Sequence, residues 1–372
     1  MKILVLSSSY EKFILNYNKK NKSSKLNFVE YQENLFKQSF GVNGFFRSGF
    51  EKLGLNSIEY ICNDFTGQTK WILEFYGISF LNSLIDIFAR FSFFKRVLNK
   101  LGYFDYIVLK QVEITKPDIL YIHEYNLLKS KTLMELKKYT KIMVGHVGRN
   151  LKDLERFKNY DMVFTSHTET IEILSKLNIP VYYTKLGFHE AVINQIEYGS
   201  KKHFITYLGS LNGVHKEKTE EIVNFFNNHE FDFNIYGQGI NDFDDSHPIH
   251  KFYRGEAFGI DMYQIIANSH IVLNRHAFYN GNNLRNYEVT GIGSLLLSDY
   301  QPSLDDDFEI NEEILVYKDY RELENILKKL LNNPELILTI ANAGMSKTRS
   351  SYTWEKRLNI VINTIEERLP HE

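Results

Sequence analysis

The chain has 372 residues, of which 43% are hydrophobic and 24% are charged, and its formal net charge is −2. This length exceeds that of one typical hydrophobic core, so it predicts two domains. The near-neutral charge argues against nucleic acid and acidic membranes as general partners. The single cysteine, Cys62, excludes an internal disulfide and fits a cytoplasmic protein.

The hydrophobic segments do not suggest a membrane-spanning protein. The apolar run in MKILVLSSSY is too short for a signal peptide, and we expect residues 2–7 to form a buried strand. No stretch of about 18 uncharged apolar residues occurs, so no membrane span is expected. Residues 71–98 are rich in Phe, Ile and Leu but carry charges, which favours one or two amphipathic helices. We interpret them as packed on the sheet, with a peripheral contact at the inner membrane face as the alternative.

The first half of the chain alternates short apolar runs with helix-like segments, which predicts a parallel, doubly wound sheet. Residues 11–38 are polar without a clear period, so we expect a long loop or short helices there. Gly41 and Gly44 then precede an amphipathic helix that ends at Gly54. Further strands are expected over residues 57–62, 116–123, 141–145, 161–166 and 181–185.

Several polar side chains follow these strands, at the edge of the sheet where ligands gather in open α/β folds. His123 follows such a strand, and a histidine there can take part in proton transfer. A partly buried histidine with a backbone partner is the alternative. His146, Arg149 and His167 follow later strands, so we expect them to share one rim. Arg149 is a candidate cation for a phosphate or an acidic acceptor, and a solvated arginine is its alternative.

The second half repeats the alternation, with strands expected over residues 203–208, 231–236, 249–253, 270–274, 294–298 and 315–317. Gly209 follows the first of these strands and Gly237 the second. Lys216 and Lys218 stand at the start of the helix between them, where two solvated lysines are the simpler interpretation.

The stretch NGNNLRNYEVTGIGSLLLSDY, residues 280–300, predicts a small polar loop, a short helix and a buried strand. A helix N-terminus after such a loop presents free N–H groups and a positive dipole end, which suit a diphosphate. Arg285 adds a guanidinium that fits phosphate oxygens. Glu288, one turn later, can accept two hydrogen bonds from a ribose diol. The alternative is that Arg285 and Glu288 simply pair on the surface of an ordinary helix.

The run R-N-Y-E-V-T-G-I-G-S-L-L-L-S-D resembles the donor-site segment of GT-B glycosyltransferases, most closely the CgeB-like group related to glycosyltransferase family 4. The resemblance implies an α/β protein of GT-B architecture, with two Rossmann-like doubly wound domains facing a central cleft. It implies an acceptor domain over 1–195 and a nucleotide-sugar donor domain over 196–352. Residues 352–357, Y-T-W-E-K-R, resemble the start of the family's last helix, so 353–372 should cross back to the first domain.

The resemblance also implies roles for individual residues. The implied donor-binding residues are Gly209, Lys218, Gly237, Arg254, Asn280, Gly281, Asn282, Asn283, Arg285 and Glu288. The acceptor-side candidates are Gly41, Gly44, His146 and Arg149, and the catalytic candidates are His123, Arg285 and Lys216. Which lysine contacts the diphosphate stays open. Asn280 stands where the wider family 4 pattern has a glutamate, which leaves the identity of the sugar open.

The implied reaction moves a sugar from a nucleotide-diphosphate sugar to a hydroxyl of a glycan, lipid-linked or protein acceptor, with retention of configuration. Cationic side chains and the helix N-terminus would stabilise the departing diphosphate without a metal or a bound cofactor. We interpret Asp305, Asp306 and Asp307 as a solvated turn rather than a metal site. Two other functions stay open: a nucleotide-sugar epimerase on the same fold, and a non-catalytic nucleotide-binding member of a glycan-assembly complex.

Overall fold

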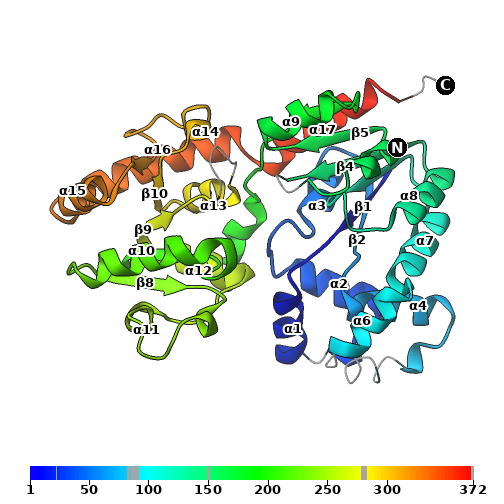
Figure 1. Cartoon of the computed structure of the whole chain (residues 1–372), viewed down its shortest axis with the longest axis horizontal. Coiled ribbons are helices and arrows are strands. Elements are labelled where there is room, and N and C mark those ends of the chain that lie inside the picture. The colour runs from blue at the N-terminus through cyan, green and yellow to red at the C-terminus, as the bar shows by residue number, and fades with distance from the viewer. Residues whose placement is uncertain (22, 82–83, 85–91, 149–150, 278–282, 370–372) are drawn as a thin grey trace. The chain divides into compact units, whose positions relative to one another are not determined.

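The computed structural model describes residues 1–21, 23–81, 84, 92–148, 151–277 and 283–369. The chain divides into two compact units, Met1–Lys185 with Arg357–Glu372, and Leu186–Lys356. Each unit contains one parallel sheet with helices around it (Figure 1). The expected fold class, an α/β protein with two doubly wound domains, is confirmed.

The first unit is built on a six-stranded parallel sheet with the order β2-β1-β3-β4-β5-β6. Between β1 and β3 the strand order reverses direction, and open α/β sheets bind ligands at the carboxyl ends of strands beside such a switch point. The strands are β1 (Lys2–Ser7), β2 (Asn56–Ile61), β3 (Ile119–Ile122), β4 (Ile142–Val147), β5 (Met162–Thr165) and β6 (Val181–Tyr183).

Residues 11–38 form two helices where the sequence suggested a loop or short helices. The second begins with a capping box, in which the Asn27 side chain accepts from the Glu30 N–H and the Glu30 carboxylate accepts from the Asn27 N–H. The helices of this unit are α1 (Glu11–Lys20), α2 (Phe28–Phe36), α3 (Phe45–Lys52), α4 (Phe65–Phe75), α6 (Ser92–Lys100), α7 (Tyr103–Thr115), α8 (Ser130–Leu136) and α9 (Thr168–Ser175).

The last helix, α17 (Trp354–Glu366), contributes its residues from Arg357 onward to the first unit. Leu358 fills the space beside Gly49 of α3, where an added Cβ would lie 2.4 Å from the leucine. Arg368 lies over the ring of Tyr182 in β6, 5.8 Å from its centroid. These contacts join the end of the chain to both α3 and β6.

The second unit has a five-stranded parallel sheet with the order β11-β10-β9-β7-β8 and a switch point between β7 and β9. The strand predicted over 249–253 is wrong, because Ile249 and Phe252 bury at a spacing of three residues and form the short helix α11 (Ile249–Phe252). The strands are β7 (His203–Leu208), β8 (Phe233–Tyr236), β9 (Ser269–Asn274), β10 (Leu295–Asp299) and β11 (Leu315–Tyr317).

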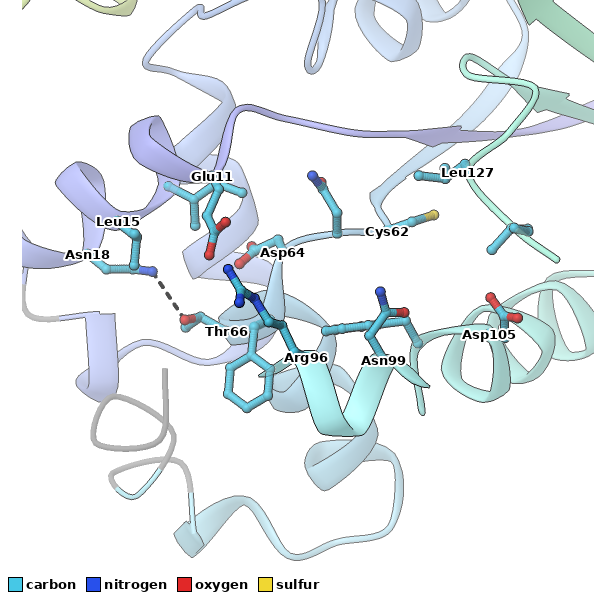
Figure 2. A pocket seen from close by; sticks show the side chains of 15 residues that line it. Glu11, Leu15, Asn18, Cys62, Asp64, Thr66, Arg96, Asn99, Asp105 and Leu127 are labelled. Carbon is cyan, nitrogen blue, oxygen red and sulfur yellow. Dashed lines mark hydrogen bonds between the residues drawn. The ribbon is translucent and has the colours of Figure 1, made fainter. Parts of the chain in front are cut away.

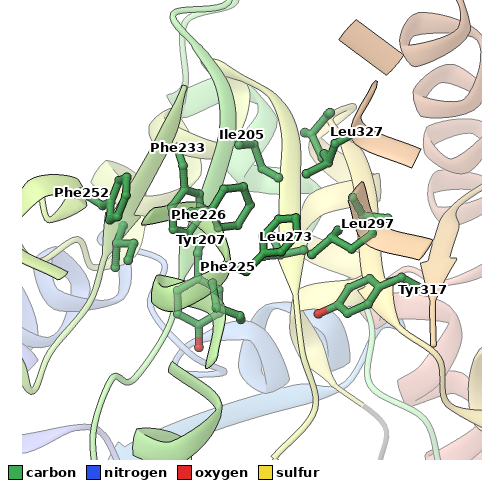
Figure 3. Close-up of a cluster of buried hydrophobic side chains, with 14 of the residues drawn as sticks. Ile205, Tyr207, Phe225, Phe226, Phe233, Phe252, Leu273, Leu297, Tyr317 and Leu327 are labelled. Atoms are coloured by element: carbon green, nitrogen blue, oxygen red, sulfur yellow. The ribbon is translucent and has the colours of Figure 1, made fainter. Parts of the chain in front are cut away.

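Alternate residues of this sheet enter two separate cores. One core, which includes Phe225, Phe226 and Leu273, lies under α10 (Lys216–Asn227) and α15 (Tyr320–Leu331) (Figure 3). The other contains Tyr263 and Tyr287, from α12 (Gly259–Ala267) and α13 (Leu284–Ile292). The remaining helices are α14 (Pro302–Asp305) and α16 (Pro334–Ser351). Helices α10 and α13 therefore start at the same edge of the sheet but on opposite faces.

The segment 71–98 falls partly outside the described residues, at 82–83 and 85–91. Its described part includes the end of α4 and the start of α6, with Phe80 and Phe93 exposed. A peripheral membrane contact through this segment stays a prediction. In the part of the chain that the structure describes, no helix combines the length and apolarity needed to span a bilayer.

Candidate functional site

Two glycine loops meet at the carboxyl edge of the second sheet. A Cβ on Gly237, which follows β8, would lie 1.8 Å from the carbonyl oxygen of Gly209, which follows β7. The Gly209 N–H donates to the Tyr236 carbonyl at 3.1 Å, and the Gly237 N–H donates to the Gly255 carbonyl at 3.0 Å. The structure thus brings Gly209 and Gly237 together, and only glycine at 237 permits the contact.

Arg254 follows α11 and its guanidinium is bonded back to the protein. Its Nε donates to the Asn234 side-chain oxygen at 2.8 Å and its Nη1 donates to the Lys251 carbonyl at 3.0 Å. These bonds order the turn that carries Gly255, whose carbonyl holds Gly237. A direct contact of Arg254 with the donor stays a prediction.

The N-terminus of α13 is anchored to the end of β9 by asparagine side chains. The Asn283 side-chain oxygen accepts from the Arg285 N–H at 2.9 Å and so caps the helix. The Asn283 amide donates to Asn274 at 3.3 Å, and the Asn274 amide donates to Asn286 at 2.8 Å. Asn280, Gly281 and Asn282 lie outside the described residues. Gly293 ends α13 at a φ of 94°, in the left-handed region that favours glycine.

Arg285 and Glu288 form an ion pair inside α13, with 2.6 Å between Nη1 and Oε2. The pair weighed as the alternative therefore exists, but it is buried rather than on the helix surface, since Glu288 is only 5% exposed. Tyr263 of α12 donates to the other carboxylate oxygen at 3.0 Å. Burial, with the Glu288 carboxylate adding to it, raises the pKa of Tyr263 well above its usual value, so it remains a donor.

Lys216 and Lys218 point to different places. The Lys216 ammonium donates to the Asp242 carbonyl at 3.0 Å and lies 5.4 Å from the centroid of the Phe243 ring. The Lys218 ammonium donates to the His276 carbonyl at 2.9 Å, next to the end of β9. Neither contact tests diphosphate binding, so both roles stay predictions.

His123 and Glu124 follow β3 beside the switch point of the first sheet. The Ser8 hydroxyl, after β1, donates to the Glu124 carboxylate at 2.5 Å across this point. Burial lowers the pKa of His123 to about 4, so its ring is neutral at pH 7. Among the described residues, its Nδ1 is buried without a hydrogen-bond partner. The sequence did not predict a role for Glu124, although it directly follows a singled-out histidine.

His146 lies within β4 rather than after it, and 5.1 Å separates its ring centroid from that of His123. Its Nδ1 is bonded to the Tyr121 hydroxyl at 2.8 Å. Burial lowers the pKa of His146 well below its usual value, and His123 and His167 lower it further. The two histidines are therefore close, neutral neighbours. Arg149, expected on the same rim, lies outside the described residues.

The N-terminus of α3 is held by a buried carboxylate for which the sequence predicted no role. Glu59 of β2 accepts from the Gly44 N–H at 3.0 Å, from the Arg47 N–H at 3.3 Å and from the Ser7 hydroxyl at 2.7 Å. Burial raises the pKa of Glu59, and these hydrogen bonds oppose the rise. The Gly44 N–H is therefore already used within the fold. The sequence feature that could have indicated this role is an acidic residue, Glu59, at an inward-facing position of a strand.

A pocket of about 270 Å³ opens where β2 ends and is lined by α1, α4, α6 and α7. The carboxylates of Glu11 and Asp64 and the guanidinium of Arg96 turn toward one another in it (Figure 2). Asp105 and Asn99 add further polar groups, and Phe65 and Phe104 supply aromatic surface. Carboxylates, amides and an aromatic wall together are suited to a hydroxyl-rich ligand.

The described part of the chain contains no group of three or more His, Cys, Asp or Glu side chains placed to hold a metal ion. The description of residues 305–307 as a solvated turn is wrong for Asp307. That side chain is 2% exposed and accepts from the buried Tyr287 hydroxyl at 2.8 Å. A buried hydroxyl requires an acceptor, and Asp307 supplies it.

The comparison with solved structures is decisive for the fold. HepE from Anabaena, in complex with UDP-glucose, is similar over 99% of this chain and 100% of its own, with a TM-score of 0.59 and 12% identity. This chain has the GT-B fold. Sucrose-phosphate synthase from Thermosynechococcus elongatus is similar over 73% of this chain and 79% of its own, with a TM-score of 0.53 and 10% identity.

Other comparisons agree with this fold. A mutant of TarM from S. aureus, in a complex that includes UDP, is similar over 70% of this chain and 58% of its own, with a TM-score of 0.51 and 13% identity. Residues 217–363 match a family model described as glycosyl transferase-like, and this span contains Arg285 and Glu288. No curated protein matches the chain in sequence.

Proposed function

We propose that the chain is a glycosyltransferase that moves a sugar from a nucleoside-diphosphate sugar to a hydroxyl of a glycan, lipid-linked or protein acceptor. The observation that carries this proposal is the buried Glu288 carboxylate, fixed one turn into the helix that follows β9 in a GT-B fold. A carboxylate held there can accept both hydroxyls of a ribose. HepE binds UDP-glucose, which favours a UDP-sugar as the first donor to test.

Arg285 and the start of α13 would bind the donor diphosphate. A guanidinium has five N–H donors, so Arg285 can keep its bond to Glu288 and still donate to phosphate oxygens. The backbone of the Gly209 and Gly237 loops, in contact at the same edge of the sheet, would bind the nucleoside. Lys216 would supply the second cation.

In the proposed reaction, the bond between the sugar C1 and the diphosphate oxygen breaks and a bond from C1 to the acceptor oxygen forms. Negative charge accumulates on the departing diphosphate, where Arg285 and the helix N-terminus stabilise it. The acceptor hydroxyl gives its proton to the departing diphosphate oxygen, and the neutral His123, whose buried Nδ1 lacks a partner among the described residues, is our candidate to accept a hydrogen bond from that hydroxyl. The proposal includes retention of the anomeric configuration. It also places the chain in the CgeB-like group related to glycosyltransferase family 4.

The acceptor would bind in the first unit, and the pocket with Glu11, Asp64 and Arg96 is our candidate for its binding site. Three carboxylates line this pocket against one guanidinium, which favours neutral or cationic hydroxyl-rich acceptors over acidic ones. Replacing Asp105 by Asn should raise the KM for the acceptor and leave the affinity for UDP unchanged.

A thermal-shift panel of UDP, GDP, ADP and CDP tests the proposal, because a ligand that binds only the folded state raises the melting temperature. We expect stabilisation by one nucleotide, and slow hydrolysis of its sugar conjugate by the purified protein. Stabilisation by none of them would overturn the proposal. Epimerised sugar after incubation with donor alone would indicate an epimerase, and binding without any turnover would indicate a non-catalytic protein.

A further inference from the structure

Arg275 is a buried cation that the proposed donor site does not use. It follows β9, is 5% exposed, and its guanidinium carbon lies 5.4 Å from the centroid of the Tyr207 ring. Its Nη2 donates to the His215 carbonyl and to the Thr219 hydroxyl, both at 2.7 Å. Its Nε and Nη1 have no hydrogen-bond partner among the described residues. Buried N–H groups are costly without acceptors, so this guanidinium requires oxygen atoms from another source.

Arg275 lines a pocket that can supply the space for such oxygens. This pocket has a volume of about 320 Å³ and lies at the ends of β9, β10 and β11, beside α10 and α15. Lys218 and Lys318 also line it, so three cations share one pocket with the carboxylates of Glu221, Asp299 and Asp319. Figure 3 shows Tyr207 and Tyr317 at one end of the apolar core under α10 and α15.

The acidic groups of the pocket are already bonded elsewhere. Asp299 accepts from the N–H and from Nδ1 of His276, at 2.9 and 2.8 Å. Asp319 accepts from the Glu322 N–H and caps α15, and Glu221 accepts from the Tyr320 hydroxyl. Among the side chains that line this pocket, the buried polar atoms without a partner in the described part of the chain are Nε and Nη1 of Arg275.

This pocket lies on the face of the second sheet opposite to Glu288. Arg275 continues the alternation of Ile271 and Leu273, which enter the core under α10. Glu288 instead contacts Tyr263, in the core under α12 and α13. A nucleotide sugar held by Arg285 and Glu288 would therefore leave the Nε and Nη1 groups of Arg275 without hydrogen-bond acceptors.

We propose that the pocket formed by Arg275, Lys218 and Lys318 is a second ligand site, which binds a phosphate-type oxyanion while a nucleotide occupies the donor site. Tetrahedral oxyanions present several oxygens at once, which matches donors on separate guanidinium nitrogens. Because Arg275 also holds the His215 carbonyl and lies over Tyr207, an anion here would stiffen the loop that leads to Lys216.

Titration calorimetry with inorganic phosphate tests this site on the full chain. Wild type should bind phosphate saturably, and Lys318→Ala and Arg275→Lys should each weaken binding about tenfold. Lys328→Ala is the matched control, since that lysine lies on α15 outside the pocket and pairs with Glu324. No saturable binding to wild type, or equal affinity in all three variants, would overturn the proposal and leave only ordered water as the partner of Arg275.

A second titration separates this site from the donor site. Phosphate binding should persist with the same affinity in the presence of saturating UDP. Displacement of phosphate by UDP would assign the anion to the donor site and overturn the proposal. A protein that binds phosphate but no nucleotide would contradict the proposed glycosyltransferase function and leave the second site standing.

Discussion

Arg285 Nη1 and Glu288 Oε2 lie 2.6 Å apart within one turn of α13, and both side chains are mostly buried. Pairs at this spacing on an exposed helix contribute only about 0.2–0.5 kcal/mol. Here the Tyr263 hydroxyl fixes the second carboxylate oxygen as well. The carboxylate is therefore oriented before any ligand arrives, which is the condition for tight recognition of a ribose diol.

Tyr263→Phe should weaken UDP binding about fivefold to tenfold, because it removes the hydroxyl that orients Glu288 and keeps the ring that packs in the core. The free energy of unfolding should fall by only about 1 kcal/mol. Calorimetry with UDP and urea denaturation measure the two effects. An unchanged UDP affinity would show that the tyrosine has no positioning role.

Gly237→Ala should disrupt the contact between the two glycine loops, since its Cβ would lie 1.8 Å from the Gly209 carbonyl oxygen. We expect a loss of about 1–3 kcal/mol in the free energy of unfolding, together with weaker nucleotide binding. Gly199→Ala is the control, because no heavy atom lies within 4 Å of its added Cβ. If both variants unfold at the same urea concentration, the loops do not depend on this contact.

Glu59→Gln should destabilise the first unit by about 1–3 kcal/mol, because one amide group replaces an acceptor that serves the Gly44 and Arg47 N–H groups. Glu324→Gln removes a carboxylate from the surface of α15 and serves as the comparison. Thermal melts of the two variants measure the difference. A smaller effect at Glu59 than at Glu324 would contradict its role as the buried cap of α3.

His123 should make the protein less stable in acid. Its pKa is about 4 in the fold and about 6.5 when unfolded, so below pH 6.5 only the unfolded chain takes up its proton. The stability that the neutral ring contributes is complete above pH 6.5 and is lost as the pH falls toward 4, by about 1–3 kcal/mol. His123→Asn should flatten this part of the stability profile, whereas His250→Asn, at an exposed position, should not. Parallel profiles for wild type and His123→Asn would refute this assignment.

The sequence predicted the sheets well because their strands are continuous apolar runs. The expected strands over 203–208 and 315–317 occur as β7 and β11. The strand predicted over 249–253 is wrong because a short apolar run fits either a strand or one helical turn. The segment forms a helical turn, in which Ile249 and Phe252 are both buried. The helices within 11–38 were partly missed because the Asn27–Glu30 capping box was not recognised.

The site was less predictable than the fold, because its geometry depends on contacts between distant segments. The sequence placed Arg285 and Glu288 on one helix, but Tyr263 is separated from Glu288 by 25 residues and becomes its partner only through packing of α12 against α13. Glu59 and Arg275 were missed for the same reason. Each is a charged residue at an inward position of a strand or just beyond its end, and that pattern was the available signal.

Binding of UDP to Glu288→Gln tests the central claim most directly. Glutamine keeps the size of the side chain but removes the charge and one acceptor oxygen, so we expect UDP affinity to fall about tenfold or more relative to wild type. An unchanged melting temperature of the variant in the absence of UDP would show that the fold is intact. Equal UDP affinity in the wild-type and Glu288→Gln proteins would contradict the account.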